Sequence, residues 1–238
     1  MSAAANEGLG KALGMATAGS GTSAPTTAGQ AILPGQDGLP RAGLRDEKEA
    51  IRQLAQMWGL PLQDGDPCED VVKANLRCYR SHSGFGELKQ LDRPAVLKLY
   101  DPANRAYYAL MTGLTDSSVT LRAGDAAQTV NLVSMIRHFR GEFVTLWRAP
   151  PTFDSIVEMS DQGPEVDWIA VQLAKLNGEP APAPDQPFDQ RLLKQVRHVQ
   201  RAQGLFVDGV LGPVTLMHLN RVAGVAEPNL RNSATATE

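Results

Sequence analysis

The chain has 238 residues, of which 42% are hydrophobic and 21% charged, and its formal net charge is −3. This composition suits a folded protein with a core, and the charge gives no sign of a nucleic-acid-binding protein. No run approaches the ~18 apolar residues of a membrane-spanning helix. The N-terminus also lacks the basic region and apolar block of a signal peptide. We therefore expect either a cytosolic protein or the exported part of a longer one, whose export signal or membrane anchor lies upstream.

The first 44 residues are rich in Ala, Gly, Ser, Thr and Pro and contain few large apolar side chains. Such a segment buries too little surface to offset its chain entropy. We predict a disordered linker over 1–44 and order from about Asp46. There, Ile51, Leu54 and Trp58 share one face of a predicted helix, with Asp46 as its N-cap and Gly59 at its end.

The next hundred residues predict an α+β domain over 45–150. Short helices are expected at 68–75, 85–91 and 128–139, and strands at 76–82, 94–101, 106–114, 118–124 and 141–150. The strands are rich in Val, Leu, Tyr and Thr and are separated by turn residues, which is typical of an antiparallel meander. In the helix at 128–139, Val130, Val133 and Ile136 are predicted to point inward.

A second unit is predicted over 160–222, followed by a flexible tail over 223–238. We expect helices at about 165–178, 188–204 and 213–222, the last with Pro213 in its first turn, where a missing N–H costs nothing. The residues predicted to face the core of the first two helices are Val166, Ile169, Leu173, Leu176, Leu192, Val196 and Val199.

Cys68 and Cys78 are the only two cysteines, and the four histidines are scattered along the chain. This pattern lacks the spacing of a metal site, so neither a metal nor another cofactor is expected. Two nearby cysteines fit a single disulfide, which implies an oxidising compartment. The alternative is a pair of reduced cysteines in the core.

The stretch 196–219, "VRHVQRAQGLFVDGVLGPVTLMHL", resembles the C-terminal half of the common peptidoglycan-binding domain. The matching features are Val199-Gln200, Gly204-Leu205, Asp208-Gly209, Gly212-Pro213, Thr215 and Leu219. The resemblance implies a three-helix peptidoglycan-binding module in which Gln200, Asp208, Gly209, Gly212 and Thr215 are the candidate site residues. The alternative is that these residues only shape the loop between two helices. Gly209 supplies a tight turn, Gly212 would allow a close approach, and the Thr215 hydroxyl would cap or tie the turn.

A basic stripe lies on the predicted middle helix of this module. Arg191, Lys194, His198 and Arg201 follow one another at helical spacing. Such cations can bind the carboxylates of the peptidoglycan stem peptides. The alternative is an ordinary solvated helix face.

The segments "CEDVVKANLRCYRS", "LKQLDRPAVLKLYD", "YYALMTGL" and "RGEFVTLWRAP" together resemble the periplasmic region of the general secretion pathway protein A family of type II secretion. In that family a cytosolic ATPase and one membrane helix precede a domain like the papain-like C39 bacteriocin-processing peptidases, and a peptidoglycan-binding domain follows. The resemblance covers about 45–222. No phosphate-binding loop or membrane helix occurs in this sequence. The chain would therefore be the exported portion, tethered to the inner membrane through an anchor upstream.

The peptidase-like positions are degenerate in this sequence. By the resemblance, Cys68 lies near the nucleophile position, Tyr107 stands where the catalytic His is expected, and Asp125 could fill the acid position. Tyrosine, with a pKa near ~10, is a poor base for a thiol at neutral pH. We expect an inactive peptidase fold with Cys68 bonded to Cys78. A cysteine in a disulfide cannot be a nucleophile.

The resemblance implies a periplasmic, peptidoglycan-binding component that helps a secretin to be assembled or placed through the cell wall. Its partners would be peptidoglycan, the companion general secretion pathway protein B and, indirectly, the secretin. One alternative is a cysteine peptidase or peptidoglycan hydrolase that the C-terminal module targets to the wall. Another is a structural spacer that binds nothing.

Overall fold

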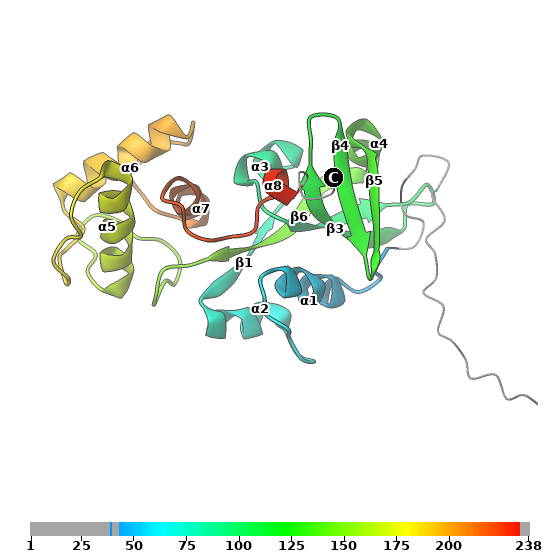
Figure 1. The fold of residues 1–238 in the computed structure, drawn as a ribbon, viewed down its shortest axis with the longest axis horizontal. Helices are drawn as coiled ribbons and strands as arrows, with labels where there is room; N and C mark the ends of the chain where they lie inside the picture. Colours follow the sequence, from blue (N-terminus) through cyan, green and yellow to red (C-terminus); the bar gives the residue numbers. More distant parts are fainter. Residues whose placement is uncertain (1–38, 40–42, 234–238) are drawn as a thin grey trace, which may run out of the picture. The chain divides into compact units, whose positions relative to one another are not determined.

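The computed structural model describes Leu39 and residues 43–233. A six-stranded antiparallel sheet, in the order β1-β6-β2-β3-β4-β5, organises the first part of these residues (Figure 1). Its strands are β1 (Leu76–Ser81), β2 (Ala95–Tyr100), β3 (Ala106–Leu114), β4 (Ser118–Ala123), β5 (Ala126–Asn131) and β6 (Phe139–Arg148). Strands β2 to β5 pair in chain order, and β6 returns to lie between β1 and β2.

Helices surround and follow this sheet. In chain order they are α1 (Glu47–Met57), α2 (Pro67–Asp70), the 3₁₀ helix η1 (Val71–Ala74), α3 (Phe85–Leu91), α4 (Leu132–His138), α5 (Pro164–Asn177), α6 (Gln190–Ala202), α7 (Pro213–Val222) and α8 (Leu230–Ser233). We call Glu47–Arg148 the sheet region and Pro164–Val222 the helical region. Both lie within one compact unit of the chain. Among the described residues, no helix combines the length and the apolar character needed to cross a bilayer.

The two faces of the sheet build two separate parts of the core. Alternate side chains of a strand point to opposite faces, so in β6 Val144 and Leu146 join one hydrophobic cluster while Phe143 and Trp147 join the other. Helices α1 and α2 cover the first face, and α3, α4 and α8 cover the second (Figure 1). The Asp46 carboxylate caps α1 as predicted, accepting the Lys48 N–H at 2.9 Å.

The first face is closed by the disulfide between Cys68 of α2 and Cys78 of β1. This confirms the pairing expected from the sequence. It also excludes the alternative of two reduced cysteines, since the described part of the chain holds no free cysteine.

The helix predicted over 128–139 is wrong over its first four residues. Residues 126–131 form β5, which pairs with β4 along its whole length, and α4 starts only at Leu132. Gly124, with a φ of +63°, permits the tight turn between the two strands. Val130 is buried from the strand, but Val133 and Ile136 are exposed, and Met135 is the buried residue of α4.

The helical region follows the predicted boundaries, with two changes in which side chains are buried. Leu176, predicted to face the core, is exposed at the end of α5. In α6, Leu193 is buried and Leu192 only half-buried. Val157 and Leu211 exchange main-chain hydrogen bonds of 3.1 and 2.9 Å, which tie the segment before α5 to the loop before α7.

Helix α7 joins the two regions. Its six consecutive residues 215–220 are all buried, which requires cover on every side of the helix. It packs on α5 within the helical region and on α3 and β6 of the sheet region. The helical region is therefore not a free-standing trio of helices.

The two ends of the described chain correct the predicted linker and tail. Leu39 is buried, and Leu44 forms a bridge to Tyr108 in β3 with bonds of 2.9 and 2.8 Å, so parts of the predicted linker pack. The rest of it, 1–38 and 40–42, lies outside the described residues. The tail predicted over 223–238 is ordered as far as 233, because the Glu227 side chain and Leu230 are buried. Residues 234–238 lie outside the description.

Candidate functional site

The loop between α6 and α7 is built around the buried side chain of Gln200. Its amide nitrogen donates to Asp208 Oδ1 at 2.8 Å and to the Val210 carbonyl at 3.0 Å. Its amide oxygen accepts the Gly209 N–H at 2.8 Å. One side chain from the last turn of the helix thus holds three consecutive residues of the loop.

Asp208 completes this arrangement from the loop side. Its Oδ1 also accepts the Val210 N–H at 2.9 Å, and Arg197 donates to its carbonyl at 3.2 Å. Burial opposes ionisation, but the hydrogen bonds from Val210 and Gln200 outweigh it, so the pKa of Asp208 lies below its usual value. The ionised carboxylate is the form that holds the turn.

Gly209 and Gly212 differ in what they require. Gly209 has a φ of +85°, and a Cβ there would come within 2.3 Å of Leu193 Cδ1, so only glycine fits. Gly212 has an ordinary φ of −82°, and its nearest contact would be Ile156 at 4.0 Å. The close approach expected at Gly212 is therefore absent. Gly212 is also the N-cap of α7, so Thr215, buried in the first turn, does not cap the helix.

These contacts favour the structural alternative for the motif. Both amide atoms of Gln200 and the Oδ1 atom of Asp208 bond within the loop, Gly209 sets its backbone, and Thr215 is buried. A ligand of this module would therefore meet the exposed residues that the loop and α6 present.

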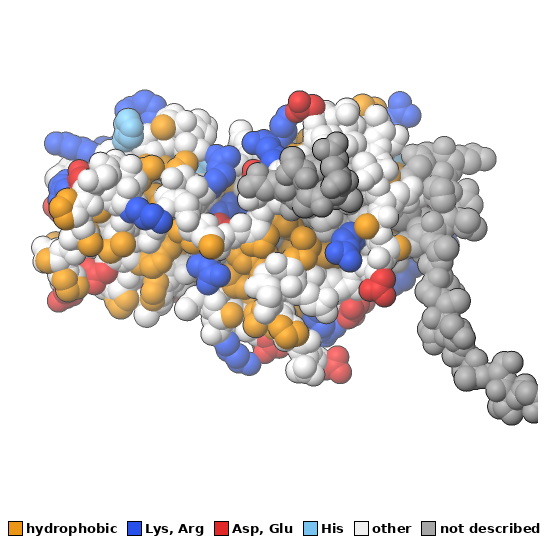
Figure 2. Space-filling model, viewed as in Figure 1, with side chains coloured by type: hydrophobic (Ala, Val, Ile, Leu, Met, Phe, Trp, Pro, Cys, Tyr) orange, Lys and Arg blue, Asp and Glu red, His pale blue; other side chains and the backbone are white. Residues whose placement is uncertain are grey.

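Helix α6 presents a basic surface. Arg191, Lys194, His198 and Arg201 are all exposed, and the helix contains no acidic residue. Figure 2 shows Lys and Arg side chains along the part of the surface where α6 lies in Figure 1. Arg191 pairs with Glu179, whereas no hydrogen bond or ion pair to a described residue involves the side chains of Lys194 and Arg201. Two cations of the predicted stripe are thus available to an anion.

Phe206 is a feature of this surface that the sequence motif did not single out. Its side chain is 84% exposed on the loop that follows α6, and the neighbouring Val207 is partly exposed. A large aromatic residue between Gly204 and the Asp208-Gly209 turn is the signal that could have found it.

The degenerate peptidase positions are not brought together. Cys68 is in the disulfide and faces the cluster under α1, whereas Tyr107 packs in the cluster on the opposite face of the sheet. It is the next residue, Tyr108, that packs on the Cys68 side. There, burial and then the Glu47 carboxylate raise the pKa of Tyr108. Tyr107 and Tyr108 lie on different sides of the sheet because adjacent side chains of a strand point to opposite faces.

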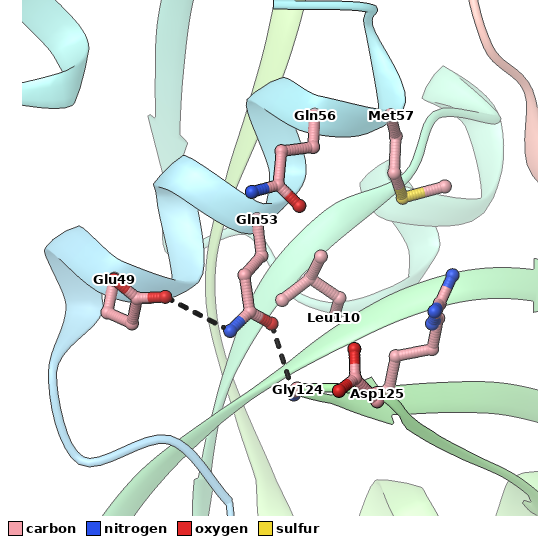
Figure 3. Close-up of a pocket in the computed structure, with 8 residues that line it drawn as sticks. Glu49, Gln53, Gln56, Met57, Leu110, Gly124 and Asp125 are labelled. Carbon is pink, nitrogen blue, oxygen red and sulfur yellow. Dashed lines mark hydrogen bonds between the residues drawn. The ribbon is translucent and has the colours of Figure 1, made fainter. Parts of the chain in front are cut away.

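Asp125 lies elsewhere, at the turn between β4 and β5, where it lines an open cavity of about 470 Å³ beside α1 (Figure 3). Gln53 crosses this cavity, accepting the Gly124 N–H at 3.1 Å and donating to Glu49 at 3.2 Å. Asp125 therefore shares this cavity with amides, a carboxylate and Arg122, and none of the described residues that line it is a histidine. Within the described residues, no group of three or more His, Cys, Asp and Glu side chains could hold a metal ion.

Comparisons with known proteins agree with this architecture. Residues 162–219 match the family described as "Putative peptidoglycan binding domain". The chain is 27% identical over 186 residues to general secretion pathway protein A of Aeromonas hydrophila, covering 78% of this chain and 34% of that protein. It is 24% identical over 192 residues to the putative general secretion pathway protein A of Escherichia coli (strain K12), covering 79% and 38%. The chain thus spans little more than a third of the length of these relatives.

A solved structure shows the same fold. A periplasmic domain of the EpsAB fusion protein of the Vibrio vulnificus type II secretion system has a TM-score of 0.58 and 23% identity, with 78% of this chain and 82% of that one covered. The predicted α+β class, a small antiparallel sheet with helices followed by a helical region, is confirmed, and the helical region is the part that matches the peptidoglycan-binding family. The resemblance to general secretion pathway protein A that the sequence motifs indicated is confirmed as well.

Proposed function

We propose that this chain is a periplasmic, peptidoglycan-binding part of a type II secretion component, which helps a secretin to be assembled or placed through the cell wall. The observation that carries the proposal is the match of 162–219 to a peptidoglycan-binding family inside a similarity to general secretion pathway protein A that covers 78% of the chain. The peptidoglycan-binding match placed after a sheet region within this similarity is more specific than either match alone.

We further propose that α6 contacts the carboxylates of the stem peptides. Lys194 and Arg201 lie on its exposed face, and neither pairs with a described residue. Guanidinium and ammonium groups bind carboxylates with short, charge-assisted hydrogen bonds. Arg191 already pairs with Glu179, so its share would be smaller. The motif residues Gln200, Asp208 and Gly209 then act indirectly, by holding the loop that follows this helix.

The partners and the tether rest on the relatives. The solved relative is a fusion of A and B parts by its name, which supports the companion protein B as a partner of this chain. The curated relatives extend well beyond the aligned portion, which leaves room in such proteins for the expected inner-membrane tether.

We propose that the sheet region is not a working peptidase. The Cys68 sulfur is bonded to Cys78, and the tyrosine placed at the histidine position faces the other side of the sheet. A thiol nucleophile needs an adjacent base. Peptide cleavage and cell-wall zymography with the Cys78→Ala variant, which frees Cys68, test this. Turnover that disappears when Cys68 is also replaced would establish the enzyme alternative.

Sedimentation with purified peptidoglycan sacculi tests the wall-binding proposal. We expect the whole chain to sediment with sacculi, and Lys194→Glu with Arg201→Glu to weaken binding at least about tenfold, because two attractive contacts become repulsive. The matched control is Lys89→Glu with Arg137→Glu, which reverses two exposed cations of the sheet region and should bind like the unaltered chain.

Three outcomes separate the ideas. Loss of binding in both double variants would show a general charge effect in place of a site on α6. Unchanged binding in both would reject α6 as the contact surface while keeping wall binding. Failure of the unaltered chain to sediment would favour the spacer alternative.

A further inference from the structure

A buried ion pair lies where α7 meets the sheet region. Arg93, in the connection between α3 and β2, and Glu227, beyond α7, have side chains only 3% and 5% exposed. The Arg93 guanidinium donates to the Glu227 carboxylate, to the Leu91 carbonyl at 2.9 Å and to the Met217 carbonyl of α7 at 2.8 Å. Charges removed from water in this way persist only when they are well paired.

The other oxygen of Glu227 is held by two more donors. It accepts the main-chain N–H of Arg148 at 2.8 Å and the side-chain amide of Asn220 at 2.9 Å. Asn220 also donates to the Arg148 carbonyl at 2.8 Å. We call Arg93, the Arg148 N–H and the Asn220 amide the Arg93 cradle. Its three donors converge on one carboxylate from separate parts of the chain.

The surroundings of the cradle can accommodate a small anion. A cavity of about 230 Å³ adjoins it, lined by Arg93, Arg221, the segment 224–229 and also Leu91 and the acidic Asp92. Arg93 Nε and His218 Nε2 are buried without a hydrogen-bond partner among the described residues, and so are the oxygens Asp92 Oδ1 and Asn220 Oδ1. Burial, together with Arg221 and Arg93, lowers the pKa of His218 to about 4. A positive charge at His218 is thus disfavoured, chiefly by its burial.

Glu227 belongs to a segment, Gly224–Leu230, that runs back from α7 to the sheet region; we call it the C-terminal strap. At its far end, Leu230 is fully buried in the core, and its N–H donates to the Asp92 carbonyl at 3.2 Å. The strap is therefore fixed at both the cradle and Leu230. Arg93 and Arg148 come from the sheet region, whereas Met217 and Asn220 come from α7.

We propose that the Arg93 cradle is a carboxylate-binding site that the chain fills with its own Glu227, and that this occupancy fastens the strap and α7 to the sheet region. A small monocarboxylate in solution then takes the same place when the Glu227 side chain is removed. The inference is independent of whether the helical region binds peptidoglycan.

Chemical rescue of Glu227→Ala tests the site. Thermal unfolding is measured against rising sodium acetate or propionate, with sodium chloride at equal ionic strength and acetamide as an uncharged mimic of the same shape. We expect the variant to melt about 10 °C below the unaltered chain. Each tenfold rise in carboxylate above its Kd should then restore about 3–5 °C. Chloride and acetamide should restore nothing.

The controls assign the rescue to the cradle. Glu179→Ala removes a half-buried carboxylate that pairs with Arg191, and acetate should not change its melting beyond the chloride effect. Arg93→Met combined with Glu227→Ala should lose the rescue. Hydrogen exchange in α7 should be faster in Glu227→Ala and should slow again with acetate if the strap is refastened.

The proposal remains testable if Glu227→Ala does not fold alone. In that case the variant is refolded by dilution from urea in the same series, and the yield of folded protein should rise with acetate or propionate only. Carboxylates that perform no better than chloride or acetamide, in melting or in yield, would overturn the proposed site. Rescue without any change of exchange in α7 would overturn its role as a fastener.

Discussion

The two faces of the sheet are closed in different ways. Under α1 and α2, the core is closed by a disulfide between residues only 10 positions apart. On the other face, the hydrophobic cluster runs from Leu39 to Leu230 and includes residues of α5, α6 and α7. One face is completed locally and covalently, and the other by residues distant in sequence.

Because different contacts complete the two faces, we expect the stability of each face to depend on different residues. The disulfide constrains the unfolded chain around α2 and β1, and no part of it comes from the helical region. The second face is held by contacts such as Arg93 to Met217, 124 positions apart, whose formation requires the whole fold. When contacts of the strap are removed, we expect α1 to remain protected from hydrogen exchange better than α7 does.

The largest expected effect comes from Arg93→Ala. It leaves the Glu227 carboxylate buried without its cation, which should lower the free energy of unfolding by about 3–5 kcal/mol. Urea denaturation measures this loss. Hydrogen exchange should accelerate in α7 and α3 much more than in α1 if the two faces are separable.

Arg105→Ala is the matched control for that change. Arg105 is exposed and pairs with Asp101 in the turn between β2 and β3, so its loss should cost less than about 1 kcal/mol. Equal acceleration of hydrogen exchange in α1 and α7 of the Arg93 variant would show that both faces unfold as one unit. That result would contradict the expected independence of the two faces.

Replacing both cysteines by alanine is the converse change. The chain-entropy estimate for so short a loop is about 3 kcal/mol, and we expect the loss to fall first on α2, η1 and β1. Exchange measured with and without the disulfide should therefore increase in 66–81 and leave α7 protected. Greater exposure of α7 than of β1 would contradict local closure.

Local patterns in the sequence were sufficient to predict most of the elements. The Asp46 cap, the strand β3 and the Pro213 start of α7 are each encoded by neighbouring residues. β5 was mistaken for helix because "QTVNLVSMI" also fits helical spacing, and only pairing with β4 decides between the two. The strap was missed because a segment such as "GVAEPNL" has no periodicity. Its order comes from Arg93, distant in sequence.

The site was predicted unevenly for a similar reason. The residues of the peptidoglycan-binding motif were found, but spacing alone could not show that Gln200 and Asp208 bond to each other. Their role in the loop is visible only in three dimensions. The two cysteines were paired correctly from their proximity. The side of the sheet that Tyr107 faces depends on strand register, which the sequence left open.

The smallest expected effect is a pH dependence of the free energy of unfolding, which comes from α7 and not from the face under α1. His218 in α7 is buried, and burial, Arg221 and Arg93 lower its pKa to about 4. In the unfolded chain its pKa is about 6.5, so between these values the unfolded state binds the extra proton and stability falls as the pH is lowered. From pH 6.5 to 5 the loss should reach about 2 kcal/mol by linkage.

Urea denaturation at several pH values, with His218→Gln as the comparison, isolates this contribution. The variant should lack the part of the slope between pH 6.5 and 5, and acid should accelerate exchange in α7 of the unaltered chain before it affects α1. His138 is half-buried, with its Nδ1 atom 2.7 Å from the Tyr100 carbonyl oxygen, and His138→Gln offers the matched control in the sheet region. If the slope disappears in His138→Gln and persists in His218→Gln, the acid sensitivity comes from the sheet region, and α7 is not the part that unfolds first.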